Sequence, residues 1–139
     1  MPTANVNIVA ILVAALLTFV LGAFWYSPVL FARQWMQAQG YTSEKVEEMK
    51  KKGMTRAYAV SMLCYVVTAY VVALLAGYTN STTLAQGLWL GFLCWLGFAA
   101  TIGLVANMFS GKPIAAWVID AGYQLAYLVI MSVLLSLWR

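Results

Sequence analysis

The residues best placed to do chemistry in this chain form a polar stripe close to its C-terminus. Asp120, Gln124 and Tyr127 recur at near-helical spacing, and Tyr123 lies beside them. A carboxylate inside an apolar helix is costly unless it is paired or neutral, and such residues often mark ion or substrate pathways. We therefore treat these four residues, together with Asn107 of the preceding segment, as a candidate intramembrane polar site.

Two interpretations of Asp120 remain open at this stage. In the first, the carboxylate pairs with Arg33, Arg56 or Lys112 and locks helix ends together. In the second, Asp120 is a proton or cation site. A similar stripe of hydroxyl side chains in an earlier segment can satisfy the polar groups around Asp120 if the two helices pack. That stripe consists of Tyr58, Ser61, Tyr65 and Thr68.

Other kinds of chemistry are excluded by composition. The chain has no histidine, so one chain cannot form a Ser-His or Cys-His nucleophile pair or a four-ligand haem or zinc site. We expect no metal, no cofactor and no enzymatic activity. Cys64 and Cys94 should be small buried residues whose heights in the bilayer differ by about 10 Å, beyond disulfide reach.

The elements that must position these residues are transmembrane helices. Only 9% of the residues are charged, compared with about 25% in a soluble domain, which excludes the water-soluble class. A helix needs about 20 apolar residues to cross the hydrocarbon layer. The sequence predicts a single all-α polytopic membrane domain over residues 1–139, a compact bundle of four transmembrane helices. We place the spans at 8–26, 57–77, 87–109 and 114–138.

Orientation follows from the basic residues, because Lys and Arg in short loops stay on the cytoplasmic side. Six of the eight lie in the loop of residues 27–56, so we expect this loop to be cytoplasmic and both termini to be outside. The six are Arg33, Lys45, Lys50, Lys51, Lys52 and Arg56.

The cytoplasmic loop is long enough to contain two helices. Ser27-Pro28 is typical of an N-cap and first helical residue, which predicts an interfacial helix over 28–39 with Phe31 and Trp35 inserted in the membrane surface. Thr42-Ser43 predicts the cap of a second, short charged helix that ends at Gly53.

Two interpretations of this loop also remain open. The charged helix can be solvated and paired with itself, or the basic residues can bind anionic lipid headgroups at about 1 kcal/mol each. For the second interpretation, the candidate headgroup or interface residues are Trp25, Tyr26, Trp35, Arg33, Lys50, Lys51, Lys52 and Arg56.

Small residues recur along the first and third spans, which allows close helix contacts. We expect a homo-oligomer, because four helices with small faces bury little by themselves. The small residues are Ala10, Ala14, Thr18 and Gly22 in the first span, and Gly87, Gly91, Ala99 and Gly103 in the third.

Several motifs resemble a family of small bacterial membrane proteins, domain of unknown function 1761. The matching elements are Leu21-Gly22-Ala23-Phe24-Trp25-Tyr26-Ser27-Pro28, then Leu30-Phe31 and Trp35, the charged loop over 42–53, and Ile119-Asp120-Ala121-Gly122-Tyr123-Gln124-Leu125. The resemblance spans essentially the whole chain. It implies four spans in the bacterial inner membrane, but no assigned activity and no catalytic residues.

Two classes of function therefore compete. We favour a structural, accessory or lipid-interacting membrane component, with membrane lipids as partners and no nucleic acid. The alternative is an oligomeric transporter or channel subunit for a proton, a cation or a small molecule, with Asp120 at its polar site. A cavity in front of Asp120 would favour transport, and a basic side chain capping it would favour the accessory role.

Overall fold

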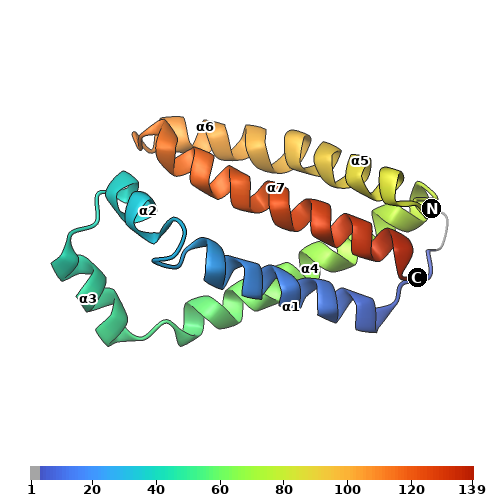
Figure 1. The fold of residues 1–139 in the computed structure, drawn as a ribbon, viewed down its shortest axis with the longest axis horizontal. Coiled ribbons are helices and arrows are strands. Elements are labelled where there is room, and N and C mark those ends of the chain that lie inside the picture. The colour runs from blue at the N-terminus through green and yellow to red at the C-terminus, as the bar shows by residue number, and fades with distance from the viewer. Residues whose placement is uncertain (1–3) are drawn as a thin grey trace.

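The computed structural model describes residues 4–139 and contains four helical segments long and apolar enough to cross a membrane. They lie side by side in a bundle, with the start of α1 and the end of α7 at the same end (Figure 1). Each of the four predicted spans coincides with one of these segments. The segments are α1 (Ile8–Trp25), α4 (Thr55–Tyr78), the continuous run of α5 (Leu84–Cys94), η1 (Trp95–Ala100) and α6 (Thr101–Phe109), and α7 (Ile114–Leu137).

Helix α7 is the centre of the bundle and packs against α1, α4 and α5. The core has many alanines, which let helix backbones approach closely where lipid supplies no hydrophobic drive for association. Larger side chains of α7, among them Met131 and Leu128, fill the space between them. The buried alanines of this core are Ala10, Ala14, Ala69 and Ala73.

The glycine pair of the third span serves a contact within the chain. A Cβ atom at Gly91 would lie 2.7 Å from the Cα of Val129, and one at Gly87 would lie 2.8 Å from the Cα of Val133. Both valines belong to α7, so the backbones of α5 and α7 meet here. This pair is therefore used inside one chain and gives no argument for a second copy.

The third span contains a wide π-helical turn, η1, between α5 and α6. Positions twelve residues apart in a regular α-helix point about 120° away from each other. One additional residue in a π turn reduces this difference to about 20°. Gly91 and Gly103 are twelve apart, and both face α7: Gly103 lies against Trp117, as Gly91 lies against Val129. The π turn therefore keeps both small-residue pairs of this span directed at the same neighbour.

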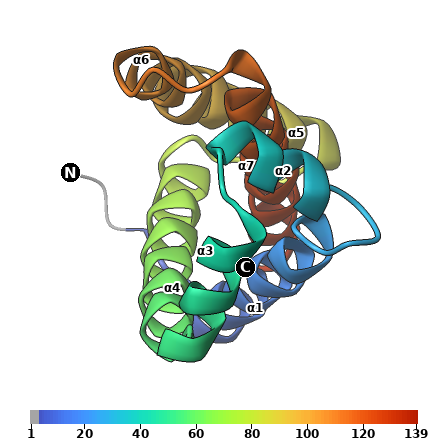
Figure 2. The ribbon, with the colours of Figure 1, turned by 90° about the vertical axis from the view of Figure 1, so that its left-hand side faces the viewer.

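Two short helices, α2 (Ala32–Gln39) and α3 (Ser43–Lys52), follow α1 and precede α4 along the chain. They stand in front of the ends of the spanning helices in Figure 2. The charged helix is confirmed: the Thr42 hydroxyl accepts from the Lys45 N–H at 3.2 Å, and Gly53 ends the helix with φ of 80°. We call residues 27–54 the α2–α3 segment.

The predicted start of the interfacial helix is wrong. Ser27 does not cap a helix that begins at Pro28, because its hydroxyl donates back to the Phe24 carbonyl at 2.7 Å. A tight turn follows instead, in which the Ala32 N–H donates to the Ser27 carbonyl at 3.1 Å. Helix α2 begins only at Ala32.

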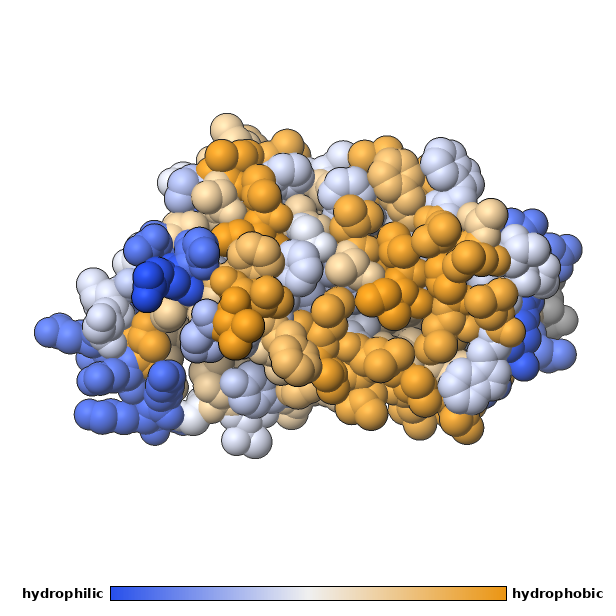
Figure 3. All heavy atoms as spheres, viewed as in Figure 1, coloured by the Kyte–Doolittle hydropathy of each residue, from blue (hydrophilic) through white to orange (hydrophobic). Residues whose placement is uncertain are grey.

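The surface has the distribution that a membrane-spanning bundle requires. Apolar side chains cover the middle of the molecule, and hydrophilic ones gather at its two ends, over α2 and α3 and near the termini (Figure 3). Long apolar side chains such as Leu63 and Phe98 are 64% and 73% exposed, which is favourable only against lipid or another apolar surface. The two cysteines are free, as predicted, but neither is buried: Cys64 is exposed and Cys94 is half-buried.

Candidate functional site

The Asp120 carboxylate is held by two aromatic side chains. Its Oδ1 atom accepts a hydrogen bond from the Tyr26 hydroxyl at 2.6 Å and another from the Trp35 indole Nε1 at 3.0 Å. Both partners are neutral. The pairing with Arg33, Arg56 or Lys112 that one interpretation required is not seen within residues 4–139.

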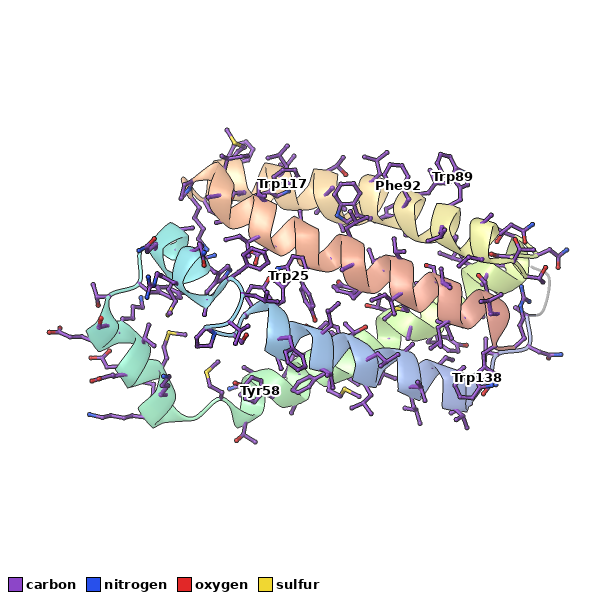
Figure 4. All side chains as sticks on the ribbon, viewed as in Figure 1. Trp25, Tyr58, Trp89, Phe92, Trp117 and Trp138 are labelled. Carbon is purple, nitrogen blue, oxygen red and sulfur yellow. The ribbon has the colours of Figure 1, made fainter. Side chains whose placement is uncertain are left out.

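Three elements bring these side chains together. Asp120 lies in the second turn of α7, Tyr26 follows the end of α1, and Trp35 lies in the first turn of α2. The junction of α1 with α7 is fixed by the Trp25 indole, which donates to the Ile119 carbonyl at 3.0 Å. In Figure 4, Trp25 accordingly lies between the end of α1 and α7. The turn after Tyr26 then returns the chain so that α2 reaches α7.

A cluster of tyrosines continues the site toward the middle of the bundle. The Tyr123 hydroxyl donates to the Thr18 carbonyl at 2.8 Å and lies 3.1 Å from the Tyr65 hydroxyl, whose proton it can accept. Gly22 leaves the room for this arrangement, because a Cβ there would lie 2.7 Å from the Tyr123 hydroxyl. The hydroxyl stripe of α4 and the polar stripe of α7 thus meet at Tyr65 and Tyr123.

A cavity of about 870 Å³ lies in front of Asp120. Its wall is mainly apolar and aromatic, with few polar groups. The lining comes from α1, α2, α3, α4 and α7, and from the turns beside them. The lining residues are Phe19, Gly22, Ala23, Tyr26, Pro28, Ala32, Trp35, Met36, Tyr41, Val46, Met49, Lys50, Met54, Ala57, Tyr58, Ser61, Tyr65, Asp120 and Tyr123.

Tyr26 remains the donor in its bond to Asp120. Burial raises the pKa of this phenol well above its ordinary value, and the hydrogen bond to the carboxylate raises it further. The phenol is therefore protonated at any physiological pH, and the carboxylate oxygen is the acceptor.

The structure brings only two of the five predicted polar-site residues together at the cavity. Asp120 and Tyr123 line the cavity together, whereas Gln124 and Tyr127 do not. The Tyr127 ring packs behind Tyr123, with ring centroids 4.9 Å apart. Asn107 belongs elsewhere: its side-chain amide donates to the carbonyls of Lys112 and Pro113 at 3.2 and 3.4 Å, so it closes the turn between α6 and α7.

Most of the predicted headgroup or interface residues also fall into two groups, one at the cavity and one on the exposed surface. Tyr26 and Trp35 hold Asp120 and line the cavity instead of only anchoring the membrane surface. Phe31, which we expected in the membrane surface, packs against Trp25 with ring centroids 5.0 Å apart and the ring planes tilted by 44°. The five basic residues are exposed on α2, α3 and the start of α4; they are Arg33, Lys50, Lys51, Lys52 and Arg56.

Sequence reasoning missed the part of the cavity wall formed by the α2–α3 segment. Tyr41, Met36, Met49 and Met54 line the cavity from this side. Methionines in a charged loop were the available signal, because a solvated loop has no need of flexible apolar side chains.

Comparison with known proteins identifies a family and nothing finer. No curated protein and no solved structure gives a significant match to the chain. A family model described as a protein of unknown function, DUF1761, matches residues 9–136. With this match and four membrane-spanning helices in the bundle, the chain belongs to the DUF1761 family of unknown function.

Proposed function

We propose that this protein is a lipid-interacting component of the bacterial inner membrane, in which the α2–α3 segment rests on anionic headgroups at the cytoplasmic surface. The observation that carries the proposal is the arrangement of Arg33, Lys50, Lys51, Lys52 and Arg56. All five are exposed and belong to α2, α3 and the start of α4. Hydrophilic side chains gather over α2 and α3 at one end of the apolar band (Figure 3).

The charge distribution supports both the orientation and the lipid class. This end of the molecule carries most of the basic residues, whereas the turn between α4 and α5 at the opposite end carries none. Basic residues beside a spanning helix favour the cytoplasmic side and attract anionic lipids. Each contributes about 1 kcal/mol near the surface, so several acting together produce a marked preference that salt weakens.

The proposal is tested with the full chain in nanodiscs. We expect phosphatidylglycerol to raise the thermal midpoint of the parent relative to phosphatidylcholine alone, and added salt to remove the difference. The triple variant Lys50→Gln, Lys51→Gln, Lys52→Gln should lose most of the effect. The comparison variant is Lys112→Gln, which removes one positive charge instead of three, from the other loop at this end, and should lose much less of the effect. Equal thermal midpoints of the parent in the two lipids would contradict the proposal.

A second function is favoured by a different observation. Asp120 lines a cavity and has neutral partners, which is the arrangement that a pathway for a proton, a cation or a small molecule needs. A complete passage across the bilayer needs further walls, and a second copy of the chain would supply them. Reconstituted liposomes test this: proton or cation flux in the parent that Asp120→Asn abolishes supports transport. Absence of flux in the parent contradicts it.

A further inference from the structure

We propose that the cavity in front of Asp120 binds a lipophilic organic cation, such as an alkyl- or arylammonium, whose charged group is recognised by the Asp120 carboxylate. This inference is independent of the lipid contacts of the α2–α3 segment. It deepens the second function above by naming the chemical class that the site takes.

The first argument is the free oxygen of Asp120. Both hydrogen bonds to this carboxylate end on Oδ1. No side chain or backbone group within residues 4–139 donates to Oδ2, and this atom is not among the buried polar atoms left without a partner. The second oxygen is therefore not fully buried, and because Asp120 lines the cavity, we infer that a ligand there can satisfy this oxygen.

The second argument is charge. Asp120 lies about 9 Å along α7 from its start at Ile114, at a depth where an ionised carboxylate needs compensation. Tyr26 and Trp35 stabilise the carboxylate with hydrogen bonds but bring no positive charge. The other carboxylates of the described chain are Glu44, Glu47 and Glu48, all exposed on α3. A cation entering the cavity thus meets a single negative charge, that of Asp120.

The third argument is the wall. Aromatic rings surround the space, and the negative faces of such rings attract cations, most strongly where water is excluded. Methionines complete the wall and adapt to ligands of differing shape. The aromatic lining residues are Phe19, Tyr26, Trp35, Tyr41, Tyr58, Tyr65 and Tyr123.

Size and the position of the basic residue are compatible with such a ligand. A volume of about 870 Å³ lies within the range of small-molecule sites, which is about 300 to 1,000 Å³. Lys50 is the basic residue of the lining, and its side chain is exposed on α3. Its long stem lets the ammonium group stay in water, away from the carboxylate.

The test uses two probes of the same shape and opposite charge, tetraphenylphosphonium and tetraphenylborate. Binding to the purified full chain in a nonionic maltoside detergent is measured by calorimetry. We expect the parent to bind the phosphonium at least about tenfold more tightly than the borate. Equal affinities, or no binding of the phosphonium, would overturn the proposal without any variant.

Variants then locate the site. Asp120→Asn should weaken phosphonium binding about tenfold and should not weaken borate binding, whereas Glu47→Gln, a loss of charge outside the cavity lining, should change neither. Met49 is half-buried, unlike the exposed Lys50, so Met49→Lys brings a positive charge closer to the cavity from α3, outside the spanning helices, and should weaken phosphonium binding. Met49→Leu is its neutral control. An equal effect of Glu47→Gln and Asp120→Asn, or unchanged binding in Met49→Lys, would contradict the assignment.

The outcome is separable from that of the other proposals. Cation binding in detergent without flux in liposomes would support the cation site and contradict the transport function. A lipid preference without cation binding would support the lipid role and contradict the cation site.

Discussion

The Trp35 indole nitrogen and the Asp120 carboxylate lie 3.0 Å apart, although 85 residues separate them along the chain. The same oxygen also accepts the Tyr26 hydroxyl, from just beyond the end of α1. One acceptor in α7 therefore holds both the end of the first span and the short helix α2 against the bundle. We therefore expect the position of the α2–α3 segment to depend on this oxygen.

Replacing Trp35 with Phe should loosen the α2–α3 segment without unfolding the bundle. The change removes a hydrogen bond to a carboxylate, worth about 1.5 to 3 kcal/mol, and keeps an aromatic ring. Trypsin cleavage at Lys45 and Lys50 in detergent should accelerate by about tenfold or more, because cleavage follows the population of the opened segment.

The control for this experiment is Trp89→Phe. Trp89 is 61% exposed on α5, far from the α2–α3 segment, so its replacement should leave the cleavage rate unchanged. Similar rates in the parent and in Trp35→Phe would mean that the hydrogen bond does not hold the segment.

Substitution of Asp120 should separate the loss of charge from the loss of an acceptor. In Asp120→Leu, the Tyr26 hydroxyl and the Trp35 indole lose their partner, at about 1 to 3 kcal/mol each. In Asp120→Asn, the amide oxygen still accepts, so the cost should be much smaller. Unfolding by denaturant in mixed micelles measures both. Equal destabilisation by the two variants would mean that the hydrogen bonds accepted by this side chain do not hold the site together.

Gly91→Ala should destabilise the bundle through the contact of α5 with α7. The added Cβ would meet backbone atoms, the Val129 Cα at 2.7 Å and the Leu128 carbonyl oxygen at 2.8 Å, so the helices must separate. We expect a loss of about 1 to 3 kcal/mol, seen as a lower thermal midpoint by circular dichroism. Gly97→Ala in the same span is the matched control, because nothing lies within 4 Å of its added Cβ. A similar loss in both variants would show that the contact with α7 is not the cause, because alanine favours a helix more than glycine does and Gly97 has no such contact.

Labelling with a membrane-impermeant maleimide should report the orientation of the chain. In a background of Cys64→Ser and Cys94→Ser, the Lys50→Cys variant should react only after cells are opened. The Thr82→Cys variant, in the turn between α4 and α5, should react in intact cells. The reverse pattern would invert the topology and remove the cytoplasmic placement of the α2–α3 segment.

The spans and the charged helix could be predicted because their signals are local. Hydropathy and length define the four spans, and Thr42 with Gly53 marks both ends of α3. The start of α2 could not, because a serine hydroxyl next to a proline can bond forward as a cap or backward to an earlier carbonyl. Ser27 does the latter, with Phe24 as the acceptor.

The candidate site was predictable only at its centre. Asp120 is conspicuous because an acid in an apolar helix is rare, but its partners lie 94 and 85 residues away. Tyr26 and Trp35 have the composition of membrane-interface anchors, and sequence cannot distinguish an indole that faces lipid from one that faces a carboxylate. Asn107 is the converse case, a polar residue whose amide is satisfied by the next turn of its own chain.

The wide turn at Trp95–Ala100 uncouples the length of the third span from its angular phase, because the turn absorbs one residue. A chain shortened by one residue here could continue as a regular α-helix, in which Gly91 and Gly103 would stand eleven positions apart and still differ by only about 20° about the axis. A chain of full length that lost the wide turn would instead swing everything beyond it by about 100°, and Asn107 would leave the carbonyls of Lys112 and Pro113. A one-residue deletion in this stretch is therefore expected to leave the far turn, where α7 and its carboxylate begin, in place.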